Sequence, residues 1–149
     1  GHRKAAGFTV PVNMLGELTD RLCEIAGREN YSIEAAEIQA DAEVSASKLD
    51  HRLWQFVERM APFGESNPTP LFITKGFLPT QVSNVGEGGE HLRLVLDGGG
   101  KQRFRAIGFG LGTTKIGTGL IDAIYALRTN YWRGKKQREL ELKAVRISS

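Results

Sequence analysis

The chain has 149 residues, of which 40% are hydrophobic and 25% are charged, as is ordinary for a globular protein with one well-buried domain or two small ones. Its sequence has no apolar run of about 18 residues that could span a membrane, and its first residues lack the apolar core of a secretory signal. A single cysteine excludes an internal disulfide and a cysteine-based zinc cluster. We therefore expect a cytoplasmic protein.

The first helix is predicted after Asn13, a plausible cap, and before Gly27. Its apolar residues recur at helical spacing, at Leu15, Leu18, Leu22 and Ile25. Cys23 lies beside this stripe, and no partner for it is indicated. We expect it to be a small core residue rather than a nucleophile.

A half-buried strand and a second helix are predicted next. Residues 37–45 alternate apolar with acidic or polar side chains, which is typical of a strand with an acidic outer face. Ser47 and Asp50 then resemble a capping box that opens a helix. Pro62 and Gly64 end this helix. Its predicted buried stripe is Leu49, Leu53, Phe56 and Met60.

From residue 71 onward, glycine-rich breaks separate five predicted strands, at about 71–85, 91–97, 102–110, 121–132 and 137–147. Leu92, Leu94 and Leu96 alternate with polar residues and predict one core face, with Arg93 on the other. Gly134 can supply the positive φ that a tight turn between the last two strands needs. Five strands with a longer connection before the fourth fit a Greek-key barrel of the oligonucleotide-binding (OB) type, although this spacing also allows another small barrel or a sandwich.

The third strand leaves its core face undecided. Arg103 and Arg105 share a face with Ile107, whereas Phe104 and Ala106 point the other way. On the fourth strand, Arg128, Asn130 and Trp132 share a face. Trp132 is expected at the hairpin tip, exposed for stacking, although a core position is about as common for an average tryptophan.

The charge is distributed unevenly along the chain. Residues 1–70 contain 7 Lys and Arg against 11 Asp and Glu, a net charge of −4, whereas residues 71–149 contain 13 against 6, a net charge of +7. Seven of those thirteen cations fall within 101–105 and 133–138, where aromatic residues lie among them. Cations can neutralise phosphates and rings can stack on unpaired bases, so this clustering favours single-stranded nucleic acid over a merely solvated basic surface.

Three loops contain residues that could take part in chemistry. In GHRKAAG at 1–7, His2 could contact a phosphate, although a lone surface histidine or the remnant of a tag is the commoner explanation. The segment APFGESNPTP at 61–70 predicts a structural brace, in which Asn67 bonds to nearby backbone. The glycines of 110–119 match no nucleotide-binding loop and predict a flexible loop that could close over a strand of nucleic acid. No catalytic constellation is evident in the sequence, so the chain does not look like a complete enzyme.

Taken in order, several segments resemble the C-terminal part of the RecJ single-stranded-DNA exonuclease family, within the DHH phosphoesterase superfamily. The resemblance spans nearly the whole chain. APFG-x-x-NP followed by a barrel is its most specific feature, and Ser66 departs from the glycine usual there. The matching segments are GHRKAAGF at 1–8, IQADAEVS at 38–45, MAPFGESNPTPLF at 60–72, HLRLVL at 91–96, RAIGFG at 105–110 and NYWRGKKQRELELKAVRI at 130–147.

The resemblance implies an α+β chain with three parts: the end of a DHH-associated domain at 1–36, a connecting strand, helix and Pro-rich loop at 37–70, and a five-stranded OB barrel at 71–149. It implies a role in DNA repair and recombination, with His2 contacting substrate phosphate. The first glycine of the family's Gly-Gly-His motif is absent. The metal motifs of the family, and with them Mg²⁺ or Mn²⁺, would lie in a part of the parent protein that this sequence does not contain.

Together, charge and resemblance predict that the barrel binds single-stranded DNA without sequence preference and guides it to that catalytic centre. The alternative is a protein-interaction module that contacts other repair proteins. The predicted DNA-binding residues are Arg93, Arg103, Arg105, Arg128, Trp132, Arg133, Lys135, Lys136 and Arg138.

Overall fold

The structure, a computed structural model, describes residues 7, 9–28, 37–132 and 134–148, without the side chains of Trp132 and Lys135. The chain divides into two compact units, residues 1–37 and 38–149. In the first unit, a short 3₁₀ turn, η1 (Val12–Met14), leads into helix α1 (Leu15–Arg28), where a helix was predicted. Cys23 is exposed on this helix, so the prediction of a core cysteine was wrong. The reason is that α1 has no buried face among the described residues of its own unit.

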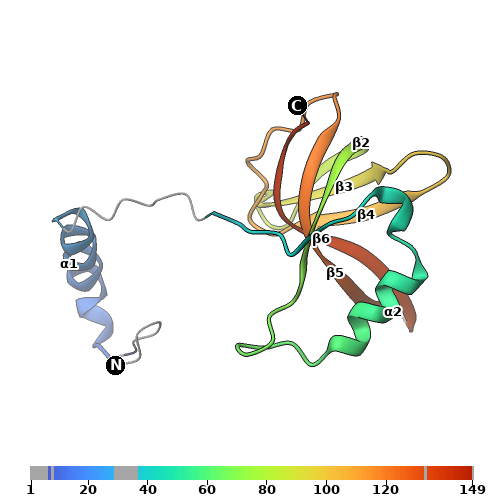
Figure 1. Cartoon of the computed structure of the whole chain (residues 1–149). Coiled ribbons are helices and arrows are strands. Elements are labelled where there is room, and N and C mark those ends of the chain that lie inside the picture. Colours follow the sequence, from blue (N-terminus) through green and yellow to red (C-terminus); the bar gives the residue numbers. More distant parts are fainter. Residues whose placement is uncertain (1–6, 8, 29–36, 133, 149) are drawn as a thin grey trace. The chain divides into compact units, whose positions relative to one another are not determined.

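The second unit is an OB-like barrel, which confirms the predicted fold. Its strands are β2 (Leu71–Val85), β3 (His91–Asp97), β4 (Arg103–Gly108), β5 (Ile121–Trp132) and β6 (Lys135–Ile147), and β1 (Ala42–Glu43) adds in parallel to β2. They lie in the order β2-β3-β4-β6-β5, and pairing of β2 with β5 closes the barrel (Figure 1). β4 and β6 are parallel, which produces the crossed Greek-key connection.

Strand β2 belongs to both halves of the barrel. Its first half pairs with β5 and its second half with β3, and the register shifts between Thr74 and Phe77. Gly76, inside this shift, has a φ of 75°, a conformation that a residue with a Cβ rarely adopts. The bulge therefore lets one long strand bend around the barrel.

The core fills the barrel interior as predicted. Leu92, Leu94 and Leu96 are fully buried, which confirms the alternation seen in the sequence. Tyr125 is also fully buried, and its hydroxyl lies 2.6 Å from that of Thr74. The Thr74 hydroxyl donates a hydrogen bond to the backbone carbonyl of Val44, just after β1. Burial raises the pKa of Tyr125 to about 12. The face of β4 is now decided: Ala106 is buried beside Leu94, whereas the arginines of β4 point outward.

Helix α2 (His51–Met60) packs against the core, and the predicted buried stripe is confirmed in part, since Leu49 is buried and Leu53 packs against the core. Asp50 is its cap, with the carboxylate accepting bonds from the backbone amides of the first turn, so the capping box from Ser47 was wrong. Residues 46–48 form a separate 3₁₀ turn, η2. This later start turns Trp54 and Val57 to the core. Phe56 and Met60, expected to be buried, are exposed.

The predicted strand over 37–45 is reduced to β1, two exposed residues paired with β2. The Asp41 carboxylate accepts a bond from the Leu71 amide at 2.8 Å and Val44 donates to Ile73, so only a short stretch follows β2 before η2 begins. The alternating pattern therefore overestimated the length of this strand, because a segment that pairs with one neighbour only, β2, forms a short strand.

The loops are held by specific contacts. Asn67 donates to the carbonyls of Met60 and Pro62, both at 2.9 Å, as the predicted brace requires. At the β5–β6 hairpin Trp132 pairs with Lys135, and Gly134 has the expected positive φ of 73°.

The segment 110–119 was expected to be a flexible loop. Gly112 donates to the Glu90 carbonyl at 2.9 Å and accepts from Asn84 at 2.6 Å, while Leu111 and Ile116 pack on the core. These contacts fix the first part of the loop against the β2–β3 turn.

Candidate nucleic-acid interface

A groove of about 630 Å³ lies on the outer surface of the barrel, across β3 and β4 and toward the β5–β6 hairpin. Its size is within the range of about 300–1,000 Å³ typical of ligand sites. In OB barrels this face, strands two and three with the neighbouring hairpin, is the one that binds oligonucleotides. The groove is lined by Gln81, Arg93, Leu94, Val95, Arg105, Ala106, Asn130, Gln137 and Glu139.

Strand register explains why these side chains meet. Arg105 pairs with Val95 and Arg93 with Ile107, so both arginines stand on the outer face of the β3–β4 ladder. Their inward neighbours are the buried leucines of β3 and Ala106. Because side chains alternate along a strand, the register that buries the leucines also places the arginines on the solvent-exposed face.

Three of the predicted cations are exposed and form no ion pair with any other described residue: Arg93, Arg103 and Arg105. Arg103 lies two residues before Arg105 and extends the same outward row along β4. No carboxylate of a described residue is within ion-pair distance of these three guanidinium groups. This row is therefore the part of the surface most ready to meet phosphate.

Arg128, also predicted, lies on β5 but is already engaged. Its guanidinium is 3.8 Å from Glu139, 3.6 Å from Glu141 and 5.3 Å from the centre of the Phe109 ring. A phosphate would have to compete with two carboxylates for this cation. Arg128 therefore contributes less free charge than its sequence position suggests.

Lys136 and Arg138 face helix α2 rather than the groove. The Glu58 carboxylate lies 2.7 Å from the Lys136 ammonium and also accepts a bond from Thr129, and these bonds hold the pKa of Glu58 below its ordinary value. Arg138 lies over the Trp54 ring at 5.8 Å, with a buried Nε that has no partner among the described residues. Both cations therefore brace the hairpin against the helix.

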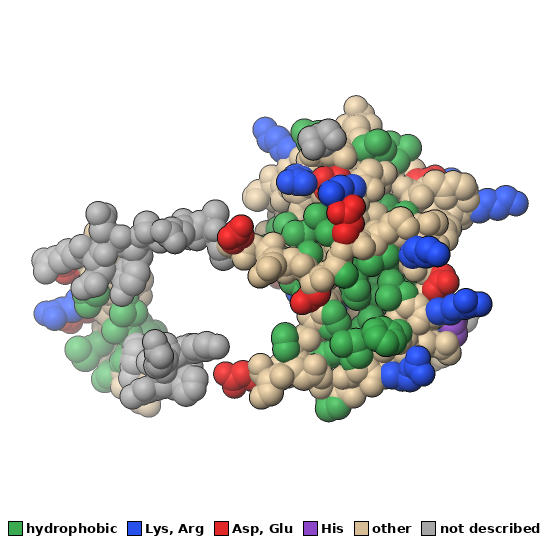
Figure 2. Space-filling view, in the orientation of Figure 1, with side chains coloured by type: hydrophobic (Ala, Val, Ile, Leu, Met, Phe, Trp, Pro, Cys, Tyr) green, Lys and Arg blue, Asp and Glu red, His purple; other side chains and the backbone are tan. Residues whose placement is uncertain are grey.

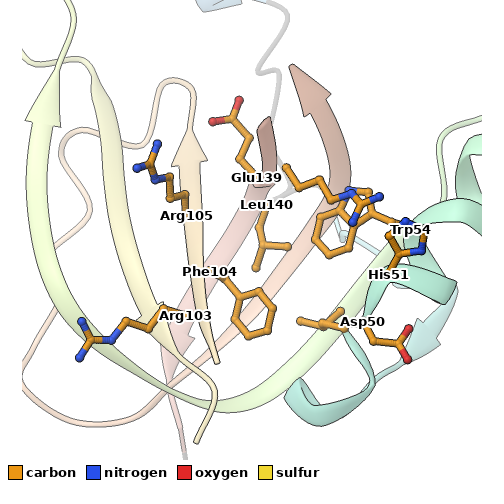
Figure 3. A pocket seen from close by; sticks show the side chains of 10 residues that line it. Asp50, His51, Trp54, Arg103, Phe104, Arg105, Glu139 and Leu140 are labelled. Atoms are coloured by element: carbon orange, nitrogen blue, oxygen red, sulfur yellow. The ribbon is translucent and has the colours of Figure 1, made fainter. Parts of the chain in front are cut away.

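A second, smaller cavity of about 180 Å³ lies where β4 and β6 diverge beside the start of α2 (Figure 3). These strands pair only at Ala106–Leu140 and Ile107–Glu141, so Trp54 and neighbouring apolar side chains form the floor below that point. Figure 3 shows Arg103 and Arg105 extending away from the helix. Arg103 and Arg105 nevertheless contribute to the lining of this cavity, so the arginine row borders it as well as the groove.

The surface is mixed rather than uniformly basic. On the face drawn in Figure 2, Lys and Arg side chains alternate with acidic ones around the barrel unit. A continuous basic patch is not seen on this face. On this face (Figure 2), phosphate binding would therefore depend on where individual free cations lie.

The remaining predicted residues fall outside what the structure describes. His2 and Arg133 are not described, and for Trp132 and Lys135 only the backbone is. The β5–β6 pairing places the backbones of these last two at the hairpin end. Their binding roles stay predictions.

Sequence reasoning missed two features of this surface. One is Phe109, which is 49% exposed and has its ring in edge contact with His91, with centroids 5.1 Å apart. The other is the uncharged and acidic wall formed by Asn130, Gln137 and Glu139. The only signal for that wall was the alternation of β5 and β6, which put these polar residues opposite buried leucines.

Among the described residues there is no group of three or more His, Cys, Asp or Glu side chains that could hold a metal ion. In the same part of the chain, no helix is long and apolar enough to span a membrane.

Comparison with known proteins supports the fold of the barrel. Residues 40–144 match the family model described as the RecJ OB domain. The single-stranded-DNA-specific exonuclease RecJ of Bacillus subtilis is 23% identical over 99% of the chain, and that of Salmonella typhimurium 26% over 94%. The chain spans only 19% and 25% of the lengths of these relatives.

Two solved structures share the fold. Crystal structures of RecJ from Thermus thermophilus, in complex with Mg²⁺ and with Mn²⁺, superpose with TM-scores of 0.60 and 0.61 at 22% and 24% identity. They cover 96% and 100% of this chain, which corresponds to 22% of each of those chains.

Proposed function

The chain belongs to the RecJ OB domain family, and on that premise we propose that its barrel binds single-stranded DNA and presents it to the catalytic domain of a RecJ-like 5′→3′ exonuclease. Two curated relatives carry the name single-stranded-DNA-specific exonuclease. Because the chain spans about a fifth to a quarter of their lengths, the activity belongs to a longer protein. The divalent metal, Mg²⁺ or Mn²⁺, would be bound in that protein's catalytic domain.

The observation that carries the proposal is the row of unpaired arginines on the OB binding face. Arg93 and Arg105 line the groove, and Arg103 continues the row along β4. Phosphates of an extended strand could be neutralised by these three cations without breaking an existing ion pair. Base stacking on Trp132, as predicted from the sequence, would add roughly 1–3 kcal/mol for one stacked base.

Salt dependence follows from the number of phosphates neutralised. For single strands the logarithm of the binding constant falls with the logarithm of salt concentration by about 0.7 per contact, so three contacts give a slope of about −2. Loss of one contact should reduce the slope by about 0.7 and weaken binding about fivefold at 0.1 M salt.

A matched pair of variants tests the proposal. Arg105→Met removes a groove arginine, whereas Arg138→Met removes one that faces Trp54 behind the groove. Anisotropy titrations with a labelled single-stranded oligonucleotide should show the fivefold loss for Arg105→Met and less than a twofold change for Arg138→Met. Equal losses for both variants, or equal affinity of the wild-type chain for duplex and single strand, would refute the proposal.

The second candidate, a protein-interaction module, draws support from the exposed apolar face of α2, where Phe56 is 55% and Met60 40% exposed. On this hypothesis Arg105→Met and Trp132→Ala leave DNA affinity unchanged. In either case, the purified 149-residue chain should not hydrolyse DNA when Mg²⁺ or Mn²⁺ is added.

A further inference from the structure

The two walls of the groove differ in chemistry. The β3–β4 wall carries Arg93 and Arg105, whereas the β5–β6 wall carries Asn130, Gln137 and Glu139. Asn130 pairs directly with Gln137 across the two strands, and Glu139 follows at the next outward position of β6. One wall therefore offers cations, and the other offers two amides and a carboxylate.

Glu139 is placed to act on a ligand in the groove. Ala106 pairs with Leu140, so the preceding residues, Arg105 and Glu139, lie side by side on the outer face. Figure 3 shows the side chains of both extending away from Trp54 and the helix. The Glu139 carboxylate forms a long ion pair with Arg128, 3.8 Å from its Nε, which is beyond hydrogen-bonding range, so its oxygens can still accept a hydrogen bond from a ligand in the groove.

This asymmetry orients a bound strand. A phosphate is repelled by a carboxylate and attracted by the arginines, so the sugar–phosphate backbone should follow the β3–β4 wall. The bases then turn toward the β5–β6 wall. A carboxylate there can accept a hydrogen bond from an exocyclic amino group, as carboxylates do from cytosine N4, but thymine presents only a carbonyl oxygen at the same position.

We propose that Glu139 makes the groove prefer bases that carry an exocyclic amino group, which cytosine, adenine and guanine do, over thymine. This inference rests on the proposed function and differs from the expectation that the barrel binds without sequence preference. The neighbouring amides of Asn130 and Gln137 can both donate and accept, so they do not discriminate in this way. The preference therefore depends on the carboxylate alone.

The test compares oligo(dC) with oligo(dT) and oligo(dU) of equal length, using the full chain and anisotropy titrations at one salt concentration. Cytosine differs from uracil mainly in its amino group, and oligo(dU) removes the effect of the thymine methyl. Oligo(dC) should bind about fivefold to tenfold more tightly than either. In Glu139→Gln the ratio should fall to near one, mainly because oligo(dT) binds better.

Glu87→Gln is the matched control, since Glu87 is exposed in the β2–β3 turn, does not line the groove, and gives the same change in charge. Glu87→Gln should raise all affinities equally and leave the ratio unchanged. Urea denaturation would show that Glu139→Gln remains folded.

The two proposals fail in different ways. Salt-dependent binding with equal affinities for oligo(dC) and oligo(dT), or a Glu139→Gln variant that behaves like Glu87→Gln, would overturn the inference alone. Absence of binding to every oligonucleotide would overturn the proposed function and the inference with it.

Discussion

The contact between the 110–119 loop and the β2–β3 turn gives a sharp test of the packing. Gly112 lies so close to this turn that a Cβ built on it would clash with the Gly89 carbonyl oxygen and lie 2.6 Å from the Glu90 carbonyl carbon. Both atoms belong to backbone, which cannot rotate away as a side chain can. Gly112→Ala should therefore displace the loop by about an ångström.

The cost can be worked from the bonds that this displacement strains. Gly112 donates to Glu90 at 2.9 Å and accepts from Asn84 at 2.6 Å. Each bond contributes about 1 kcal/mol, and overpacking costs about 1–3 kcal/mol. The two costs overlap, because a loop that moves to relieve the overpacking loses the bonds, so they are not simply added. We expect the free energy of unfolding to fall by about 2–4 kcal/mol and the Tm by roughly 8–16 °C.

Urea denaturation and thermal melting measure this loss, and Gly117→Ala is the control. Gly117 lies in the same loop, but a Cβ there meets no atom within 4 Å. It should change the free energy of unfolding by less than about 0.5 kcal/mol. A Gly112→Ala variant as stable as Gly117→Ala would show that the loop does not rest on the β2–β3 turn.

Two further predictions concern buried or bridging carboxylates. Asp122 is only 3% exposed, and this burial acts to raise its pKa. Hydrogen bonds from Ser148, Arg146 and the Gly76 amide outweigh burial and hold the pKa below its ordinary value. Asp122→Asn should lower the free energy of unfolding by about 1–3 kcal/mol at pH 7. Because the bonds stabilise only the ionised carboxylate, the difference from wild type in urea titrations should shrink as the pH falls below about 4. Glu58→Gln breaks the ion pair that joins α2 to the hairpin and should cost about 1 kcal/mol or less by the same assay, and this difference too should shrink as the pH falls through the lowered pKa of the carboxyl. A difference from wild type that stays constant, or grows, as the pH is lowered would contradict either prediction.

Much of the barrel could be predicted from local patterns. The alternation of Leu92, Leu94 and Leu96 gave the core face of β3, because burial on one side of a strand imposes a period of two. Gly134 marked the last hairpin, since few other residues adopt its φ of 73°. Such signals depend only on residues close together in the sequence, so they can be recognised without knowing the fold.

The parts that could not be predicted depend on partners far away in the chain. Helix α2 buries Trp54 and leaves Phe56 exposed because it starts at Asp50 and meets the barrel on that side. Both possible helical faces of this segment carry apolar residues. Periodicity alone could not choose between them, and only the barrel surface against which the helix packs makes the choice.

The same limit applies to the binding surface. Sequence shows a cation but not the carboxylate that faces it: Lys136 is matched to Glu58, 78 positions earlier, and Arg138 to Trp54. Conversely, the sequence pattern gave Glu139 no role in binding. Strand register places it in the groove beside Arg105, where its charge opposes that of the arginine.

The net charge of +7 in residues 71–149 therefore overstates the charge available to a phosphate backbone. If all eight predicted cations contacted phosphates, the salt slope would be about −5.6, whereas the three unpaired arginines alone give about −2. Adding Arg133 and Lys135 at the hairpin extends this to about −3.5. A measured slope between about −2 and −3.5 would mean that the described ion pairs persist when DNA binds. A slope near about −5.6 would mean that DNA breaks the bonds of Lys136 to Glu58 and of Arg128 to its carboxylates, so that the hairpin leaves helix α2 in order to grip the strand.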